Sequence, residues 1–325
     1  MSCSIAVVSD IHYASAAERV RGNDYEFRAI HNPLLRLVVR LHRRFIWLRD
    51  PLNQNHLLDL FLNEAGDFDH VIANGDYSCN TAFVGMSDDA SLESARECLA
   101  KLRQKLGQKL RLNFGDHELG KVSLFGGQGG MRLASWRRAQ DQLGLQRFWR
   151  FEIGKYVLMG VVSSLIGLPV FTRDTLPAER GEWEQLRAQH LAEVRQAFAG
   201  LKPDQKVLLF CHDPSALPFL WEEEKIRGKL QQLEQTIIGH LHSKLILWQS
   251  RLLAGMPEIR FLGHTARRLS AALRQAKKWE PFKVQLCPAL AGIELLKDGG
   301  YLALTLDPDA RRPAECHIRP LKRAR

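Results

Sequence analysis

Short apolar runs alternate with amphipathic stretches along most of the chain. The runs are rich in Val, Ile and Leu, as strands buried on both faces are, and they occur at 5–8, 71–73, 110–112, 207–210 and 236–238. Between the runs, apolar residues recur at three- and four-residue spacing, which predicts helices. The predicted helices are 34–49, 54–65, 91–106, 131–143 and 181–200. This alternation predicts an α/β fold.

The C-terminal part of the chain has a different pattern. Residues 286–296 and 301–306 are predicted strands, and Lys297-Asp298-Gly299-Gly300 between them has the composition of a hairpin turn. The hairpin predicts a second sheet that closes the fold. Further expectations are a charged helix at 222–235, a flexible glycine loop at 126–130 and a frayed basic tail at 319–325.

Each of the five apolar runs leads into a short motif with acidic or imidazole side chains. The motifs are Asp10-Ile11-His12, Gly75-Asp76, Gly115-Asp116-His117-Glu118, Cys211-His212 and Gly239-His240-Leu241-His242. Parallel strands bring their C-terminal ends to one edge of a sheet, so motifs that are distant in sequence are predicted to meet there. Mixed carboxylate and imidazole ligands suit Mn²⁺, Fe²⁺ or Zn²⁺ and suit Ca²⁺ poorly.

Taken together, the five motifs resemble those of the calcineurin-like metallophosphoesterase superfamily, whose pattern is D-x-H, G-D, G-N-H-[D/E], H and G-H-x-H. The resemblance implies a four-layer α/β/β/α sandwich. It also implies that one metal ion is held by Asp10, His12 and His242, and a second by Asp116, His212 and His240, with Asp76 bridging both. His117 would not bind metal. It would stabilise charge on the phosphate and protonate the leaving oxygen.

The activity that this resemblance implies is metal-dependent hydrolysis of a phosphoester or pyrophosphate bond. Two divalent ions about 3.5–4 Å apart would clamp the attacking and leaving oxygens, and a bridging water would ionise to hydroxide, the nucleophile, near neutral pH. Mn²⁺ is the favoured ion, with Fe²⁺ or Zn²⁺ as alternatives. Asp116 stands where the family usually has Asn, so the second metal should bind more tightly while an amide donor to the substrate is lost. The carboxylate that orients His117 is left open among Glu118, Asp213 and Asp88.

The net charge of +10 favours an anionic partner. We expect one domain over residues 1–325, with helical cap or insertion segments at 30–66 and 244–282 that combine apolar and basic residues. A hydrophobic cap with a basic rim fits a lipid-linked phosphate or pyrophosphate at an anionic membrane surface. In this respect the chain is similar to UDP-2,3-diacylglucosamine pyrophosphatases, although their third motif carries Arg where His117 stands. The alternative is that these segments are core elements with solvated charged faces.

Other functions stay open at this point. The substrate could be a nucleotide-linked phosphate, a cyclic nucleotide or nucleic acid, but the basic residues alternate with Leu, Val and Phe and not with stacking aromatics. The chain could also be a non-catalytic scaffold that binds a membrane or protein, although all seven ligand positions carry ligating side chains. The protein-phosphatase motif G-D-x-V-D-R-G is absent after Gly75-Asp76.

The location expected from the sequence is the cytoplasm, with peripheral membrane association as an option. The six cysteines form no C-x-x-C pair, which suits reduced thiols. No signal pattern and no apolar run of about 18 residues is present, so no spanning helix is predicted. The substrate-binding residues and the oligomeric state are not specified by these patterns.

Overall fold

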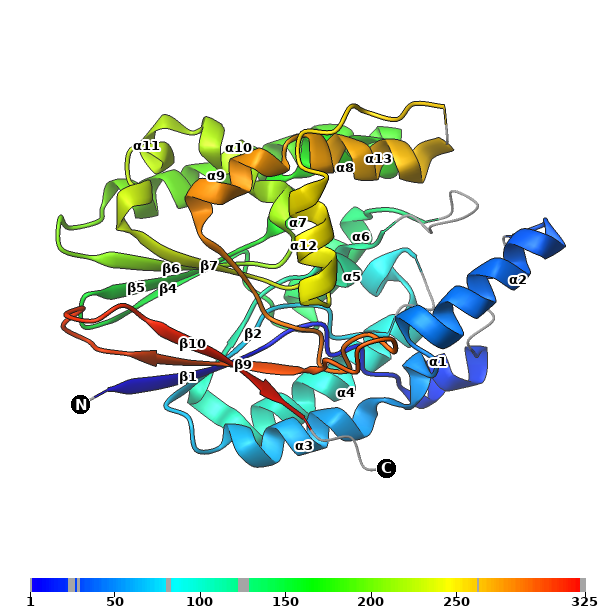
Figure 1. Ribbon diagram of the computed structural model, residues 1–325, viewed down its shortest axis with the longest axis horizontal. Coiled ribbons are helices and arrows are strands. Elements are labelled where there is room, and N and C mark those ends of the chain that lie inside the picture. Colours follow the sequence, from blue (N-terminus) through cyan, green and yellow to red (C-terminus); the bar gives the residue numbers. More distant parts are fainter. Residues whose placement is uncertain are drawn as a thin grey trace.

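Two five-stranded sheets form the centre of the molecule (Figure 1). The computed structural model describes residues 2–22, 27, 30–79, 83–121, 129–261 and 263–321. The first sheet has the order β10 (Glu315–Pro320), β9 (Gly300–Leu306), β1 (Cys3–Val8), β2 (His70–Ala73) and β3 (Leu110–Leu112). The second has the order β4 (Phe148–Ile153), β5 (Tyr156–Val161), β6 (Lys206–Cys211), β7 (Leu233–Ile238) and β8 (Val284–Leu286).

Both sheets are mostly parallel near the site. In the first sheet, β1, β2 and β3 pair in parallel, while β9 is antiparallel to β1 and β10. In the second, β5 to β8 pair in parallel and β4 is antiparallel to β5. The strands that precede the five motifs therefore end at the same edge of the two sheets, as the motifs require. These strands are β1, β2, β3, β6 and β7.

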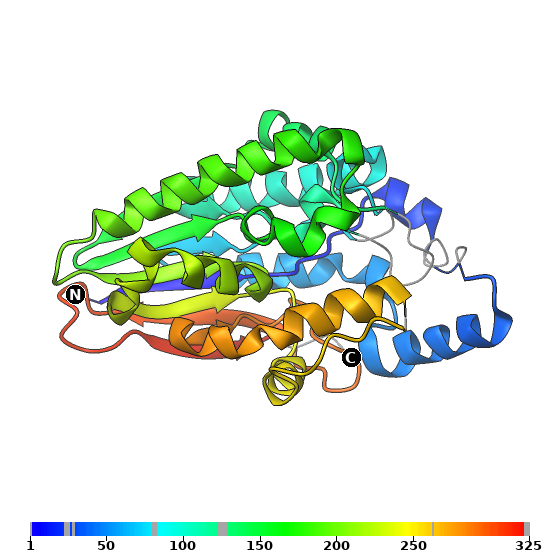
Figure 2. The same ribbon diagram turned by 90° about the horizontal axis from the view of Figure 1, so that it is seen from above.

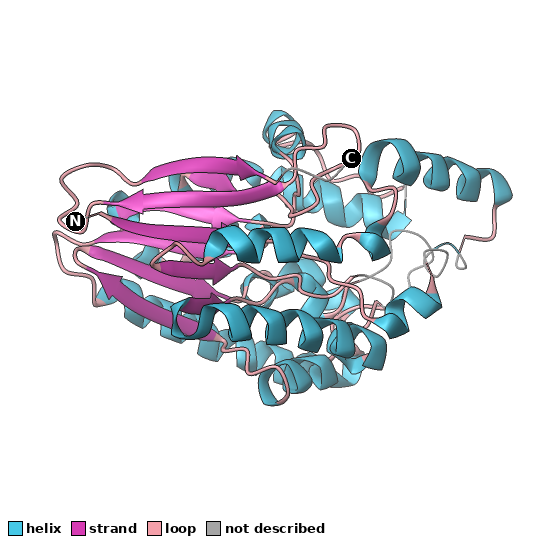
Figure 3. Ribbon diagram, turned by 90° about the horizontal axis from the view of Figure 1, so that it is seen from below, coloured by secondary structure: helices cyan, strands magenta, loops and turns pink. Residues whose placement is uncertain are grey.

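Helices cover the outer face of each sheet, as the three ribbon views show (Figures 1–3). The helices α3 (Asn55–Ala65), α4 (Asp89–Leu106) and α6 (Leu133–Asp141) pack on the first sheet. The helices α9 (Arg180–Ala199), α10 (Leu217–Glu222) and α11 (Glu224–Arg227) pack on the second. The predicted four-layer α/β/β/α sandwich is confirmed.

The continuous apolar run in β1 is explained by burial on both faces. Ile5 and Val7 point between the sheets, where they meet Leu208 and Phe210 of β6. Ala6 and Val8 point the other way, into the cluster under α3 and α4. A strand that is enclosed on two sides has no solvated face, so it does not show the polar alternation of an edge strand.

Smaller elements surround the edge where the motifs lie. They are α1 (Ala16–Arg21), α2 (Pro33–His42), the π-helical turn η2 (Arg43–Trp47), α5 (Asp116–Leu119), α7 (Ser163–Ile166), α8 (Leu168–Phe171), α12 (Lys244–Leu252), α13 (Gly263–Arg274) and the 3₁₀ segment η10 (Ala276–Phe282). The predicted segments 30–66 and 244–282 contain several of these helices, but α3 belongs to the core. The division into one domain with two insertions stays a prediction.

The predicted C-terminal hairpin is wrong. Strand β8 ends at Leu286, and β9 pairs with β1 in the other sheet. The segment between them crosses from one sheet to the other beneath the motifs, where the Leu290 amide donates to the Asp10 carbonyl and the Ala289 amide to the His242 carbonyl. Its apolar residues from Cys287 to Ile293 are buried by this crossing and not by strand pairing, whereas Leu295 and Leu296 are exposed.

The helix predicted at 222–235 is also wrong in its second half. Helix α11 ends at Arg227, and β7 begins at Leu233 because parallel pairing with β6 and β8 overrides local helix propensity. In the tail, Arg319 and Pro320 belong to β10, while 322–325 lie outside the described residues. Most of the predicted loop 126–130 lies outside them as well.

Phe210 is buried in the core between the sheets, so we expect its truncation to cause a large loss of stability. Phe210→Ala should lower the free energy of unfolding by about 3–5 kcal/mol, because a fully buried aromatic ring is replaced by a cavity. Denaturant unfolding followed by circular dichroism measures the change. Phe261→Ala is the matched control, since Phe261 is 85% exposed and should change stability by less than about 0.5 kcal/mol. Equal losses in both variants would contradict this packing.

Candidate metal centre

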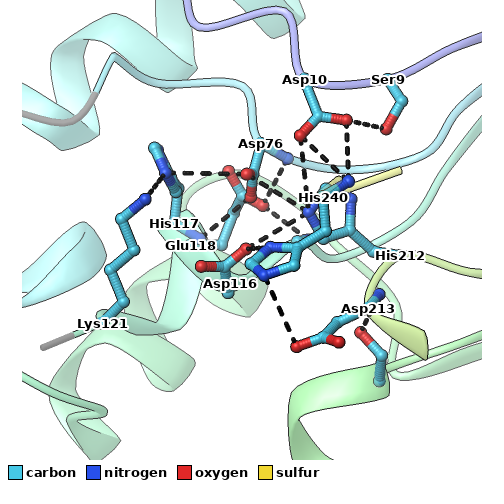
Figure 4. A network of polar contacts seen from close by, with 12 residues as sticks. Ser9, Asp10, Asp76, Asp116, His117, Glu118, Lys121, His212, Asp213 and His240 are labelled. Carbon is cyan, nitrogen blue, oxygen red and sulfur yellow. Dashed lines mark hydrogen bonds and ion pairs between the residues drawn. The ribbon is translucent and has the colours of Figure 1, made fainter. Parts of the chain in front are cut away.

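All seven predicted ligands converge at the strand ends shared by the two sheets. Figure 4 labels five of them: Asp10, Asp76, Asp116, His212 and His240. Asp10, Asp76 and Asp116 follow β1, β2 and β3 of the first sheet, whereas His212 and the two histidines His240 and His242 follow β6 and β7 of the second. Two groups of donor atoms form, each with its members within 4.8 Å of one another. They are Asp76, Asp116, His212 and His240 in one, and Asp10, His12 and His242 in the other.

The distances within each group are short. His212 Nε2 lies 3.2 Å from Asp76 Oδ2 and 3.3 Å from Asp116 Oδ1. His240 Nδ1 lies 2.9 Å from Asp116 Oδ1. In the second group, His242 Nε2 lies 3.2 Å from Asp10 Oδ1. Asp76 also forms a third cluster with His12 and His117, so it lies between the two groups.

The histidine tautomers leave ligating atoms turned into the site. His212 Nδ1 lies 2.6 Å from the Asn74 carbonyl oxygen, and His12 Nδ1 lies 3.3 Å from that of Ser78. Each Nδ1–H therefore donates to backbone, and each Nε2 atom is turned toward the carboxylates, where it can carry a proton or bind a cation. Among the described residues, the fully buried His212 Nε2 has no hydrogen-bond partner. A divalent cation would bind such an imidazole nitrogen together with the carboxylates around it. The residues therefore fit a divalent metal ion.

Backbone strain is concentrated at the ligands. Five of the eight described non-glycine residues with positive φ are predicted ligands, with φ between 51° and 59°: Asp10, His12, Asp76, His240 and His242. A left-handed conformation costs an ordinary residue about 1–3 kcal/mol and is retained where the surroundings fix it. The turn at each strand end thus directs the side chain into the cluster.

The glycines of the motifs make room for the ligands. A Cβ atom on Gly115 would lie 2.1 Å from Asp76 Oδ1, and one on Gly239 would lie 2.6 Å from Asp10 Oδ2. Any larger residue at these positions would displace a carboxylate, because such contacts are far below van der Waals separation. The close approach of two motif loops explains the recurring Gly in the pattern.

Burial and mutual attraction set the protonation of the cluster. Burial alone would raise the pKa of Asp10 and Asp116, but the neighbouring histidines hold both well below the ordinary value. Asp76 behaves similarly, with a pKa lowered to about 2. Burial opposes the charge on His240, yet Asp116 and Asp213 raise its pKa to about 9, and Asp76 and Asp10 raise that of His212. Without a cation, protons on these imidazoles balance the carboxylates.

None of the three carboxylates proposed to orient His117 does so in the described contacts. Glu118 accepts from the amides of Gly115, Tyr77 and Asp76, which ties two motif loops together. Burial and the Asp76 charge raise its pKa to about 8. Asp88 pairs with Arg21 and caps α4, and Asp213 lies 3.9 Å from His240 Nε2. The ring of His117 is positioned instead by the Ser78 carbonyl, 3.0 Å from its Nδ1.

Two further side chains at the site were missed in the sequence. Lys121 Nζ lies 2.5 Å from His117 Nε2, and the Trp47 ring lies 4.9 Å from that of His242. Burial together with the Lys121 charge lowers the pKa of His117, although Asp76 opposes this. The only sequence signal for Lys121 is its position four residues after His117, which does not distinguish it among 46 basic residues.

A cavity of about 640 Å³ opens from the cluster and is walled mostly by apolar side chains. Its inner end is formed by Asp76, Asp116, His240 and His242. Its walls come from α2, η2, α8, α12, α13 and η10 and include Val39, Trp47, Phe171, Ile246, Ala272 and Trp279. The volume is in the range of small-molecule sites.

The fold and the cluster define an α/β/β/α sandwich with a buried carboxylate–imidazole site for divalent metal ions. The family model of the calcineurin-like phosphoesterases matches residues 3–244, and the chain belongs to this family. The resemblance found in the sequence is thereby confirmed, and membership indicates a phosphoester hydrolase. No curated protein matches the chain in sequence.

The solved structures that match the chain are only distantly similar to it. A purple acid phosphatase from yellow lupin (Lupinus luteus) seeds is 13% identical, with a TM-score of 0.34, and the match covers 74% of this chain but 38% of that protein. A predicted phosphoesterase from Streptococcus pneumoniae is 10% identical over 98% and 99% of the two chains, with a TM-score of 0.30. A metallophosphoesterase from Sphaerobacter thermophilus is 12% identical over 97% and 87%, with a TM-score of 0.31. Family membership rests on the family model and not on these structures.

Metal uptake by the metal-free protein should release protons. His212 and His240 have raised pKa values, so a cation that binds their nitrogens must displace protons at neutral pH. The apparent affinity for Mn²⁺ should rise about tenfold per pH unit for each proton released, and the contribution of His240 should level off above about pH 9. Calorimetry in two buffers of different ionisation enthalpy counts the protons.

A control variant separates this effect from general titration. His317→Gln, on the exposed edge strand β10, should bind Mn²⁺ and release protons like the parent. His240→Gln should bind more weakly and release fewer protons. Mn²⁺ binding without proton release, or no binding, would refute the proposed use of these side chains.

Proposed function

We propose that this protein is a two-metal phosphohydrolase that cleaves a phosphoester or pyrophosphate bond in a lipid-linked substrate. The observation that carries the proposal is the apolar cavity whose inner end is formed by Asp76, Asp116, His240 and His242. A reacting phosphate would lie at the polar end and a hydrocarbon chain along the walls. Such a cavity suits an amphiphilic substrate better than a fully polar one.

The donor groups support two metal sites. Asp10, His12 and His242 would hold one ion, and Asp116, His212 and His240 the other, with Asp76 between them. When bound, the ions would polarise the phosphoryl oxygens and supply an activated water at neutral pH. Mn²⁺ is the favoured ion on the donor set, with Fe²⁺ or Zn²⁺ as alternatives.

His117 and Lys121 form the cationic side of the reacting position. The Ser78 carbonyl holds His117 Nδ1, which turns Nε2 toward Lys121 and Asp76. An anionic phosphate beside this pair would favour the doubly protonated imidazole, and Nε2–H would then donate its proton to the leaving oxygen. Lys121 would donate a hydrogen bond to a phosphate oxygen. This bond would replace the one that the family's usual Asn could donate and that Asp116 cannot.

Two other candidate functions fit less well. A nucleic-acid or cyclic-nucleotide substrate would call for aromatic stacking surfaces, whereas aliphatic side chains outnumber the aromatic ones of Trp47, Phe171 and Trp279 in the cavity wall. A non-catalytic scaffold has no need of seven converging ligands or of His117 beside them. The first test is therefore a screen of lipid-linked pyrophosphates, nucleotide conjugates and cyclic nucleotides with purified protein and Mn²⁺.

Two site variants should separate metal binding from proton transfer. Asp76→Ala should lose both activity and metal, because it removes the carboxylate between the two groups. His117→Ala should keep its metal while kcat falls about 10²–10⁴-fold, the usual contribution of a general acid. Metal analysis and turnover of a p-nitrophenyl phosphodiester measure both, with His317→Ala as the control. Parent-like hydrolysis by both site variants would refute the mechanism.

Blocking the cavity should affect only substrates with a long apolar chain. Ala272 lines the cavity, whereas its neighbour Ala271 in α13 does not. Ala272→Trp should lower kcat/KM for a long-chain substrate at least about tenfold, since the loss of even two buried methylenes costs about 1.6 kcal/mol. It should leave the p-nitrophenyl ester unaffected.

Ala271→Trp is the matched control for this substitution and should leave both substrates unaffected. Equal turnover of the long-chain substrate by the two tryptophan variants would refute the proposal that the substrate is linked to a lipid. The phosphohydrolase activity itself would still be read from the short ester.

A further inference from the structure

We propose that one face of the protein docks on an anionic lipid bilayer and opens the cavity toward it. This docking face consists of the outward side chains of α2 and η2 together with residues 294–296. The inference rests on the proposed function, because it names the source of the lipid-linked substrate. In the part of the chain that the structure describes, no helix is long and apolar enough to cross a bilayer.

The helix α2 exposes its apolar residues. It has no buried residue. Leu34, Leu37, Leu41 and Phe45 are 69%, 52%, 46% and 59% exposed, and their three- and four-residue spacing places them on one side of the helix. A continuous exposed apolar stripe on a soluble protein marks an interaction surface.

The exposed surface continues onto a neighbouring segment. The Leu295 amide donates to the Ile46 carbonyl, and the Glu294 amide to that of Trp47, so residues 294–296 lie beside η2. Leu295 and Leu296 are both exposed, as is Ile46. The docking face is thus built from two chain segments that are distant in sequence, and it is broader than one helix stripe.

The charge of the docking face fits anionic lipid headgroups. Between residues 30 and 49 the chain has five arginines and no acidic residue, so the acidic residue of the docking face is Glu294. Arg40, Arg44 and Arg49 are exposed, and the Arg44 guanidinium lies 5.5 Å from the Phe45 ring centroid. A basic side chain near an anionic bilayer is attracted to the lipid headgroups, and apolar neighbours insert at the same depth.

A bilayer is favoured over a second copy of the chain. A symmetric dimer through this face would bring the same arginines together, and like charges would oppose it. The bilayer also explains why the two sides of α2 are both apolar. Leu34, Leu37 and Leu41 face outward, while Leu35 and Val39 line the cavity.

The position of α2 in the molecule suits this role. It lies at the end of the molecule far from the N-terminus of the chain, at the periphery in both views (Figures 1 and 2). From there η2 leads directly to the metal centre, because Phe45 is exposed while Trp47, two residues on, contacts His242. A lipid that leaves the bilayer along α2 would therefore reach the ligands without crossing open water.

Vesicle co-sedimentation tests the docking face. The parent protein should pellet with vesicles that contain phosphatidylglycerol and bind much less to pure phosphatidylcholine, and high salt should weaken the binding. The double variant Leu41→Gln/Phe45→Gln should lower the partition coefficient at least about tenfold, since two apolar side chains no longer insert. Leu176→Gln, at a residue of similar exposure outside the face, is the matched control and should bind like the parent.

The outcomes separate docking from catalysis. Hydrolysis of the water-soluble p-nitrophenyl ester should be the same in the parent and the double variant. Its absence in both, with vesicle binding retained, would end the proposed function and leave the docking face standing. No vesicle binding, equal binding to both kinds of vesicle, or a dimer that the double variant dissociates would overturn the docking face.

Discussion

Three carboxylates held close together and out of water are the constraint on which the site depends. Asp10, Asp76 and Asp116 are almost completely buried, and their mutual repulsion is strong where water cannot screen it. The imidazoles between them supply compensating charge, as protons or as ligands to cations that replace those protons. Because the first sheet contributes the carboxylates and the second contributes His212, His240 and His242, this compensation exists only when the sheets are packed together.

The same packing keeps the ligand turns in their strained conformation. Five left-handed residues at about 1–3 kcal/mol each represent a considerable local cost. Each large side chain buried between the sheets, such as Ile5 and Phe210, contributes about 1.5–3 kcal/mol in the opposite direction. Asp10 follows Val8 of β1 by two residues, so the rigid interior and this strained turn belong to one continuous segment of the chain. Hydrogen bonds from three amides to Glu118 then fix the loops relative to each other.

The positions of the ligands could be predicted from the sequence because strand direction alone determines where Asp10, Asp76 and His212 lie. The groups that orient the histidines could not be predicted from the sequence. They are the backbone carbonyls of Ser78 and Asn74, and every residue type has such a carbonyl. The apolar run at 286–296 predicts a strand, because such a run does not distinguish paired backbone from a crossing segment. The apolar stripe of α2 was recognised, but periodicity alone does not show whether such a stripe packs on a core or lies exposed.

The short α2–η2 segment runs from the protein surface to the metal centre. Its outward side is apolar and flanked by arginines, its inward side lines the cavity, and its last turn ends at Trp47 against His242. Moving a hydrocarbon chain through water costs about 0.8 kcal/mol for each methylene, so a long lipid could not leave a bilayer at a useful rate without an apolar path. A helix that is apolar on two sides provides that path, whereas a core helix needs only one apolar side. The exposure of α2, which the stability of the fold does not require, therefore supports the proposed transfer of a lipid to the site.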